Sequence, residues 1–156
     1  MALNKRLNDF KNSLKRLNEA INETYKNLGN DYYPFFRDSA IQRFEFTVEI
    51  MWKSMKHYLL EKEGIECVSP KNCLREFFIV FNMDENESKM LLRMIDDRNL
   101  SSHTYHEEIA EEIFSNLKDY AVLLQKIVGL LEKWKYSLKH SVAEATFMTA
   151  KLWKIF

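Results

Sequence analysis

Glycine and proline are scarce in this chain, and their scarcity limits the architectures that it can adopt. Only three glycines and two prolines serve 156 residues. A β-sandwich or barrel reverses its chain about every ten residues, and glycine and proline supply much of the backbone geometry at such reversals. The apolar share of 46% is ample for a buried core, which argues against an unfolded chain. The sequence therefore predicts one all-α domain.

Apolar residues recur at steps of three and four, which is the period of an amphipathic helix. The first stripe covers residues 7–28 and ends at Gly29. A second helix is expected over residues 41–64, with Asp38 or Ser39 as its N-cap. Because this second segment is apolar on more than one side, we expect it to be the central helix of the fold.

Two further helices are predicted between the second and the last. Ser69 followed by Pro70 is an N-cap with proline at the first helical position, and it opens a short helix through LREFFIVF. The next helix begins near Asn86. It is expected to break at Ser101 and Ser102, whose hydroxyls compete with the backbone for hydrogen bonds.

The last long stripe covers residues 104–134, and the stretch 136–156 is expected to add a further helix. Together these segments predict an up-and-down bundle of four to five helices over residues 1–135. We expect residues 136–156 to form a C-terminal extension that packs on the same domain.

Charge and hydropathy exclude several classes of protein. The 23 basic and 23 acidic residues cancel, so the chain lacks the overall positive field of a protein that coats nucleic acid or an anionic membrane. Any contact with RNA must then be local. No uncharged apolar run approaches the roughly 18 residues of a membrane span, and the start MALNKRLNDF has no apolar signal core. We expect a soluble, cytoplasmic protein.

The cysteines and histidines give little sign of a metal or redox site. Cys67 and Cys73 are six residues apart and fit no paired-thiolate motif, so we expect them to be ordinary small apolar residues. His103, His106 and Glu107 have helical ligand spacing, but no further firm ligand accompanies them. We predict neither a metal nor a cofactor.

Polar residues are densest between residues 96 and 112, where Arg98 and His103 are the candidate catalytic pair. Cleavage of a phosphodiester needs a group of near-neutral pKa to move a proton and a fixed cation for the charge that develops on phosphorus. Five residues on an unbroken helix turn the side chain by about 500°, which leaves the two groups roughly 140° apart. The pair can therefore share one substrate atom only if the helix breaks, and with a break His103 would lie at the mouth of the last helix.

Tyr105 follows His103 by two residues, so in a non-helical turn its phenol can lie at the same rim as a nucleophile or a modification site. A plainer interpretation also stands. Asp96 or Asp97 pairs with Arg98, residues 104 and 107 form a capping box, and the histidine is an exposed linker residue.

Two stretches carry a resemblance to a known family. IQRFEFTVEIMWKSMKHYL and DDRNLSSHTYHEE resemble the nucleotidyltransferase substrate-binding family, a branch of the HEPN superfamily of helical bundles. The resemblance covers about residues 3 to 135. The second stretch also fits the pattern Arg-x4-His-x-Tyr through Arg98, His103 and Tyr105.

The resemblance implies a homodimeric bundle that is encoded beside a minimal nucleotidyltransferase. Such a protein is typically a toxin, a metal-independent ribonuclease that acts on RNA at the dimer cleft. By position, Arg98 would stabilise the phosphorane, His103 would act as general base or acid, and Asn99 would support them. Tyr105 would accept AMP from the partner enzyme, which silences the toxin by adding bulk and negative charge.

The same family resemblance allows a second interpretation. Its members have been described as substrate-binding subunits of the nucleotidyltransferase. In that case the bundle binds a nucleotide or a protein and has no turnover of its own. A third alternative is a plain dimerisation module.

Overall fold

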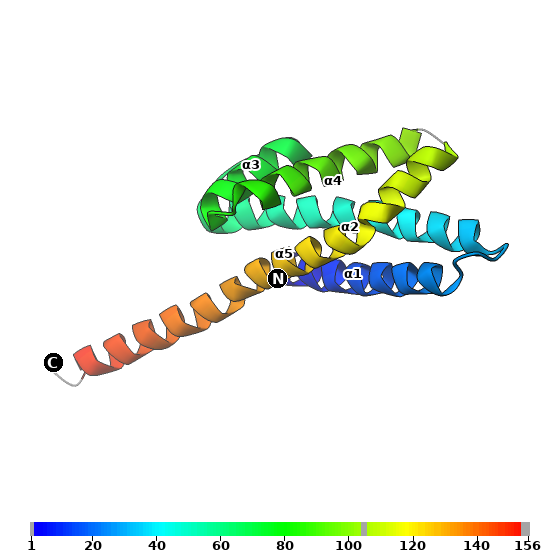
Figure 1. Ribbon diagram of the computed structural model, residues 1–156. Coiled ribbons are helices and arrows are strands. Elements are labelled where there is room, and N and C mark those ends of the chain that lie inside the picture. Colours follow the sequence, from blue (N-terminus) through cyan, green and yellow to red (C-terminus); the bar gives the residue numbers. More distant parts are fainter. Residues whose placement is uncertain (1, 104–105, 154–156) are drawn as a thin grey trace.

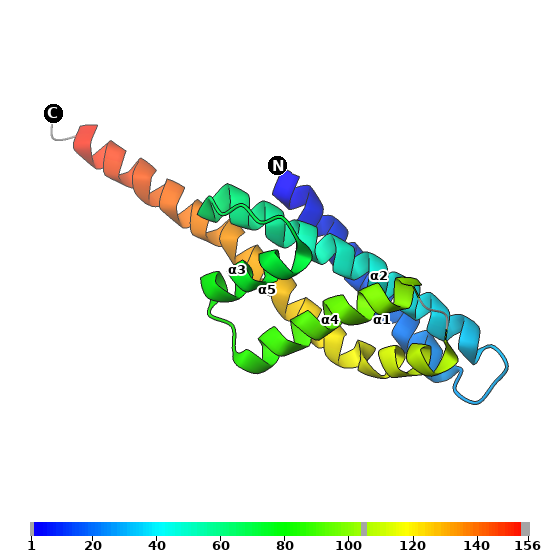
Figure 2. The ribbon, with the colours of Figure 1, turned by 90° about the horizontal axis from the view of Figure 1, so that it is seen from above.

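Consecutive helices run back and forth, as the sequence predicts (Figures 1 and 2). A computed structural model describes the backbone of residues 2–103 and 106–153 and the side chains up to residue 133. In these residues the elements are α1 (Ala2–Lys26), α2 (Tyr33–Tyr58), a π-helical turn η1 (Leu59–Glu63), α3 (Pro70–Phe81), α4 (Glu85–His103) and α5 (Glu107–Trp153). The all-α bundle is confirmed.

The start of α2 differs from the prediction. A cap at Asp38 or Ser39 was expected, but α2 begins at Tyr33 with Pro34 in its first turn. The fixed φ of proline favours a helix start at this place. Gly29 adopts φ +81°, so the chain turns directly after α1 and leaves only a short connection.

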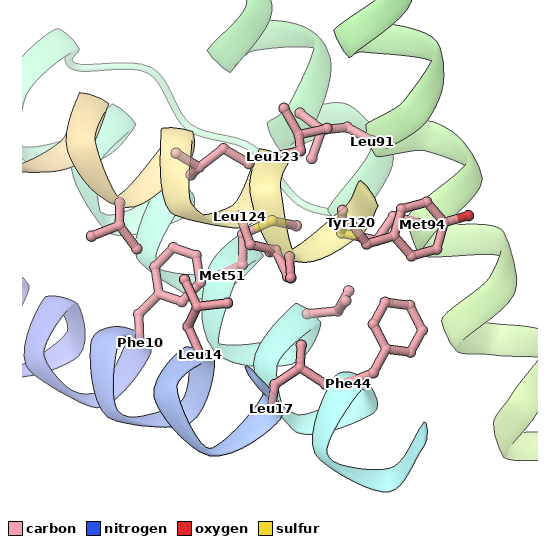
Figure 3. Packing of buried hydrophobic residues seen from close by; sticks show 14 of the residues in the cluster. Phe10, Leu14, Leu17, Phe44, Met51, Leu91, Met94, Tyr120, Leu123 and Leu124 are labelled. Carbon is pink, nitrogen blue, oxygen red and sulfur yellow. The ribbon is translucent and has the colours of Figure 1, made fainter. Parts of the chain in front are cut away.

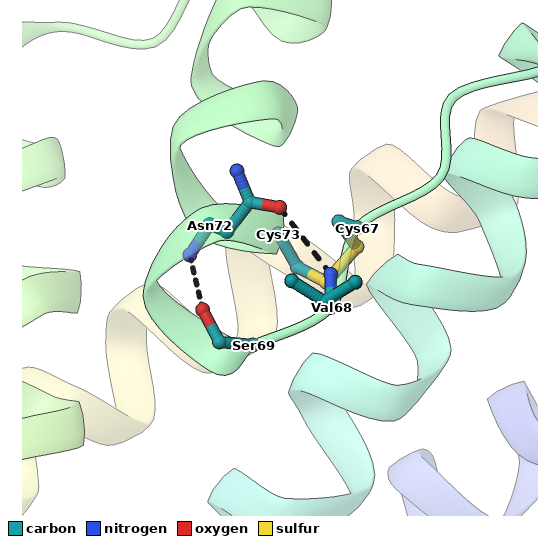
Figure 4. The surroundings of a disulfide bond; sticks show 5 residues. All are labelled: Cys67, Val68, Ser69, Asn72 and Cys73. Carbon is teal, nitrogen blue, oxygen red and sulfur yellow. Dashed lines mark hydrogen bonds between the residues drawn. A yellow bond between two sulfur atoms is a disulfide. The ribbon is translucent and has the colours of Figure 1, made fainter.

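The start of α3 matches the prediction. Ser69 is the N-cap, and its hydroxyl accepts a hydrogen bond from the backbone N–H of Asn72 at 3.3 Å. The Asn72 side chain in turn accepts the backbone N–H of Val68 at 3.3 Å (Figure 4). These two bonds tie the loop before α3 to its first turn.

The prediction for the two cysteines was wrong. Cys67 and Cys73 form a disulfide with their Cα atoms 5.1 Å apart, and both residues are buried (Figure 4). The N-cap turn at Ser69 folds the chain back, which brings residues six apart in sequence within bonding range. The disulfide therefore closes the same loop that the Ser69 and Asn72 hydrogen bonds hold.

Helix α2 is the central element, as predicted. It contacts α1, α3, α4 and α5. Figure 3 shows side chains from four helices meeting in one core, with Phe10, Leu14 and Leu17 from α1 facing Phe44 and Met51 from α2. Tyr120 of α5 stacks on Phe44 with ring centroids 5.5 Å apart. The labelled residues that α4 and α5 add to this core are Leu91, Met94, Leu123 and Leu124.

Helix α5 continues without interruption to Trp153, so residues 136–153, where a further helix was expected, continue α5. Figures 1 and 2 show this last part extending away from the other helices. The domain boundary at residue 135 and the packing of 136–156 on the bundle stay predictions.

The packing of Phe44 in the core predicts how much its substitution lowers the free energy of unfolding. Phe44 is fully buried, whereas Phe46 on the same helix is 58% exposed. We expect Phe44→Ala to lower the free energy of unfolding by about 3–5 kcal/mol, because it removes buried apolar surface and leaves a cavity. Phe46→Ala is the matched control and should change it by less than about 0.5 kcal/mol. Urea unfolding followed by circular dichroism measures both, and equal losses would contradict the packing described.

Candidate functional site

Helix α4 carries Arg98, Asn99 and His103, and it runs unbroken to His103. The break expected at Ser101 and Ser102 is absent. The Ser102 hydroxyl instead donates to the carbonyl oxygen of Arg98 at 3.0 Å. The single proton of the Ser101 hydroxyl is shared between that carbonyl oxygen, at 2.9 Å, and the Glu45 carboxylate of α2, at 2.7 Å. This bonding to the preceding turn keeps the serines compatible with a helix.

The unbroken helix changes the geometry of the predicted pair. Arg98 and His103 lie roughly 140° apart around the axis of α4, so they do not converge on one atom within a single copy. His103 ends α4 instead of opening the last helix, and α5 begins at Glu107 rather than near residue 104. His103 is exposed. Tyr105 and the predicted cap residue Thr104 lie outside the described residues.

Arg98 is held by a residue of α2 that the sequence did not indicate. Its Nη2 donates to the Glu49 carboxylate at 3.2 Å, and its Nη1 donates to the side-chain oxygen of Asn99 at 3.1 Å. Its Nε is buried, and no hydrogen-bond partner for it lies within the described part of the chain. About a third of the side chain (32%) remains exposed, so the guanidinium is anchored and still reachable from solvent.

The surroundings of Glu49, which include Arg98, lower the pKa of its carboxyl group. Burial raises the pKa of its carboxyl, but hydrogen bonds from Trp52 and Lys53 and the positive charges of Lys53 and Arg98 outweigh burial. The net result is a pKa below the usual range. Glu49 is therefore a stable anion beside Arg98 near neutral pH.

The expected pairing of Arg98 with a neighbouring aspartate is wrong. Asp96 pairs with Lys71 of α3 at 2.7 Å. Asp97 accepts a hydrogen bond from the Tyr120 phenol of α5 at 2.5 Å. Burial and this bond raise the pKa of Tyr120, so the phenol stays protonated and keeps donating. The two aspartates thus fasten α4 to α3 and α5, and Arg98 pairs with Glu49 of α2 instead.

A fully buried arginine joins the start of α2 to the start of α5. The guanidinium of Arg37 binds the carboxylates of Glu107 and Glu111 on α5 and of Asp38 beside it. Tyr33 donates to Glu111 at 2.7 Å, and burial together with this bond and the charge of Glu111 raises its pKa to about 12. We call this set the Arg37 cluster.

The Arg37 cluster was not predicted from the sequence. A single basic residue within the aromatic run YYPFFRD was the available signal, because a charge among large apolar residues is normally buried only when it is paired. The sequence suggested Glu107 as a capping-box residue, and it gave no indication that Glu107 and Glu111 bind Arg37. They are spaced four apart, which places both on the face of α5 that meets Arg37.

An open pocket of about 480 Å³ lies where α2 meets the ends of α4 and α5. We call it the junction pocket. Ser101 and Glu45 line it and are hydrogen-bonded to each other at 2.7 Å. Its other walls include Phe35, Gln42, His106 and Ile113.

A larger groove of about 1000 Å³ runs along α1 and α2. Glu49, the partner of Arg98, is one of its lining residues, so the groove reaches the carboxylate that holds Arg98. The groove is lined by five basic side chains and three carboxylates. Its basic members are Arg6, Lys15, Arg16, Arg43 and Lys53.

The described residues contain no group of three or more histidine, cysteine, aspartate or glutamate side chains arranged to hold a metal ion. No helix among them is long and apolar enough to cross a membrane.

Comparison with known proteins decides the family. The sequence profile of the family described as "Nucleotidyltransferase substrate binding protein like" matches residues 5–133. The chain belongs to this family. The match includes the whole stretch from Arg98 to Tyr105, and residues 134–156 lie beyond it.

Two relatives of this family member are informative. A Haemophilus influenzae protein named "Probable ribonuclease HepT" is 33% identical over 87 residues, which are 53% of this chain. The match spans 58% of that relative's length. A solved crystal structure of a Thermus thermophilus protein is 41% identical, with a TM-score of 0.62. It is matched over 98% of its own chain and 74% of this one.

The Arg37 cluster predicts a pH-dependent stability. Arg37→Met removes charge-assisted hydrogen bonds but leaves carboxylates that are 45% and 62% exposed and can be rehydrated. We expect a loss of about 1.5–3 kcal/mol in the free energy of unfolding at pH 7. The hydrogen bond from Arg37 lowers the pKa of Glu107, so its contribution is present above the ordinary glutamate pKa and is lost as pH falls through the lowered value.

The loss caused by Arg37→Met should therefore shrink as the pH falls from 7 to 3. Urea unfolding at both pH values measures it, with Arg43→Met on the same helix as the control. A loss that stays constant with pH, or that the control reproduces, would contradict the role of the ion pairs.

Proposed function

We propose that this protein is the HEPN component of a two-gene toxin–antitoxin module and that it cleaves RNA without a metal ion. The family match over residues 5–133 carries the proposal, because it places Arg98 and His103 within the matched region. The similarity to a protein named a probable ribonuclease supports it. A cytoplasmic location belongs to the proposal, because RNA and ATP are available there.

The chemistry follows from the two side chains. The ribose 2′-oxygen of RNA attacks the adjacent phosphorus, and the bond to the 5′-oxygen of the next nucleotide breaks. The imidazole of His103 accepts the 2′-hydroxyl proton or donates one to the leaving 5′-oxygen, and water takes part in the other of these two proton transfers. The guanidinium of Arg98 stabilises the extra negative charge on the phosphorane, with Asn99 bonded to it as a support.

The straight course of α4 supports a site that two copies share. Within one copy Arg98 and His103 face different directions. A two-fold axis beside the end of α4 would set Arg98 of one copy against the histidine of the other. We therefore propose a homodimer with two composite sites in its cleft. In each site an RNA phosphate displaces the Glu49 carboxylate from Arg98.

A partner nucleotidyltransferase encoded nearby would silence the ribonuclease activity by adenylylating Tyr105. The phenol oxygen attacks the α-phosphorus of ATP, the bond to the β-phosphate bridge breaks, and pyrophosphate leaves while the phenol proton passes to a base or to water. The tyrosine then carries an adenylyl group with a negative phosphodiester. The added charge and bulk repel an RNA phosphate beside Arg98.

One observation favours a second function, that of a non-catalytic nucleotide-binding subunit of the transferase. Glu49 already neutralises Arg98, and four glutamates lie within residues 107–112. Negative charge at this place opposes RNA binding. A protein of this kind would associate with the transferase and leave RNA intact.

The first test is RNA cleavage by the purified protein in the presence of EDTA. We expect cleavage, and we expect His103→Ala to slow it by at least about a hundredfold, because a general acid or base contributes that much. His57→Ala on α2 is the control and should keep the wild-type rate. Intact RNA with wild-type protein at every pH between about 6 and 8, together with stable binding to the transferase, would favour the binding-subunit function.

The second test asks whether the site is shared. Arg98→Ala and His103→Ala are each expected to be inactive alone. After co-expression, half of the dimers are mixed, and each mixed dimer holds one intact composite site of two, so about a quarter of wild-type activity should return. Two sites built within single copies would stay inactive in every mixture, and that result would contradict the shared site.

A further inference from the structure

We propose that the junction pocket binds an adenine base. The inference rests on the proposed function, because it names the ligand group that enters beside Arg98 and His103. The pocket is bordered by Ser101, three residues after Arg98, and by His106, three residues after His103. It therefore adjoins the end of α4 that carries both candidate catalytic groups.

The walls of the pocket suit a flat aromatic ring. Ile41, Ala110 and Ile113 supply apolar surface from α2 and α5. Phe35 also lines the pocket, and its side chain is 73% exposed. An exposed aromatic ring is costly to leave in water and gains by stacking on a base, which is the usual way that proteins hold unpaired nucleotides.

The polar side of the pocket matches the edge of adenine. The Gln42 amide offers one donor and one acceptor, the pair that reads N7 and the 6-amino group of adenine. Gln42 is an exposed residue that lines the pocket, so its amide is reachable by a ligand. Glu45 uses one carboxylate oxygen for Ser101 and keeps the other as an acceptor for the second amino hydrogen.

Guanine fits the same groups less well. It presents a carbonyl oxygen where adenine has the amino group, so that an acceptor would face the Glu45 carboxylate. A carboxylate can accept hydrogen bonds from N1–H and the 2-amino group of guanine with its two oxygens, but one oxygen of Glu45 is already bound to Ser101. These contacts select adenine.

An adenine base has two sources in the proposed function. It is either an adenosine of the RNA substrate or the base of the adenylyl group that silences the protein. Both place the same ring in the same pocket. In the second case, the bound base would hold the adenylyl group over the site and block RNA.

The test is a titration of the full-length protein with AMP, followed through backbone amide resonances. We expect saturable shifts at residues 39–45, 101 and 106, and weaker binding of GMP, CMP and ribose 5-phosphate. Gln42→Leu should weaken AMP binding about tenfold, in line with the loss of one bidentate base contact. Gln125→Leu, the same substitution at an exposed position on α5, should leave it unchanged. Equal binding of AMP and ribose 5-phosphate, or of AMP and GMP, would overturn the proposal.

A second pair of measurements separates the two sources. An uncleavable oligonucleotide of 2′-deoxycytidines with one 2′-deoxyadenosine should shift the same resonances if RNA supplies the base. Protein adenylylated by the transferase should show those resonances already shifted and should no longer bind free AMP if the adenylyl group supplies it. Because the AMP titration needs neither cleavage nor transfer, it remains decisive even if the ribonuclease activity is absent. Failure of both sources after a positive titration would still overturn the assigned role of the pocket.

Discussion

A buried guanidinium determines where the last helix of this protein begins. Arg37 has no contact with water, so its charge must be met by carboxylates, and α5 supplies two of them in its first turns. These ion pairs hold the first turns of α5 against the first turns of α2. Asp96 and Asp97 fasten α4 to α3 and α5, α4 ends at His103, and α5 begins at Glu107. The position of the candidate site is thus a consequence of where one arginine is buried.

The same arrangement separates the two groups that the proposed chemistry needs. The hydroxyls of Ser101 and Ser102 bond to the turn before them, and α4 remains helical to its last residue, His103. A single copy therefore presents a cation on one side of the helix and an imidazole on another. Glu49 holds the cation in place when no substrate is bound. In the proposed function, an RNA phosphate would compete with that carboxylate for Arg98, so binding would depend on the negative charge of the substrate.

The sequence was a good guide where local chemistry decides the structure. The Ser69–Pro70 start of α3 and the apolar stripe of α1 were predicted because capping and helical periodicity act within a few residues. Contacts across the fold were not predictable in this way. Glu49 lies 49 residues from Arg98 and Glu107 lies 70 from Arg37, and no local pattern announces either pair. Ser101 and Ser102 show the limit of helix propensity, because hydroxyls that can end a helix belong here to a helix that continues. The Cys67–Cys73 disulfide depends on the geometry of a turn, which the spacing of the two cysteines does not reveal.

The account depends most directly on the helical state of residues 98–103. Carbon-13 chemical shifts of the Cα atoms report backbone conformation residue by residue in solution. We predict positive helical secondary shifts for every residue from Arg98 through Ser102, with no interruption at Ser101. Values typical of an extended or irregular backbone at Ser101 and Ser102 would restore the kink, allow both groups to converge within one copy, and contradict the shared site.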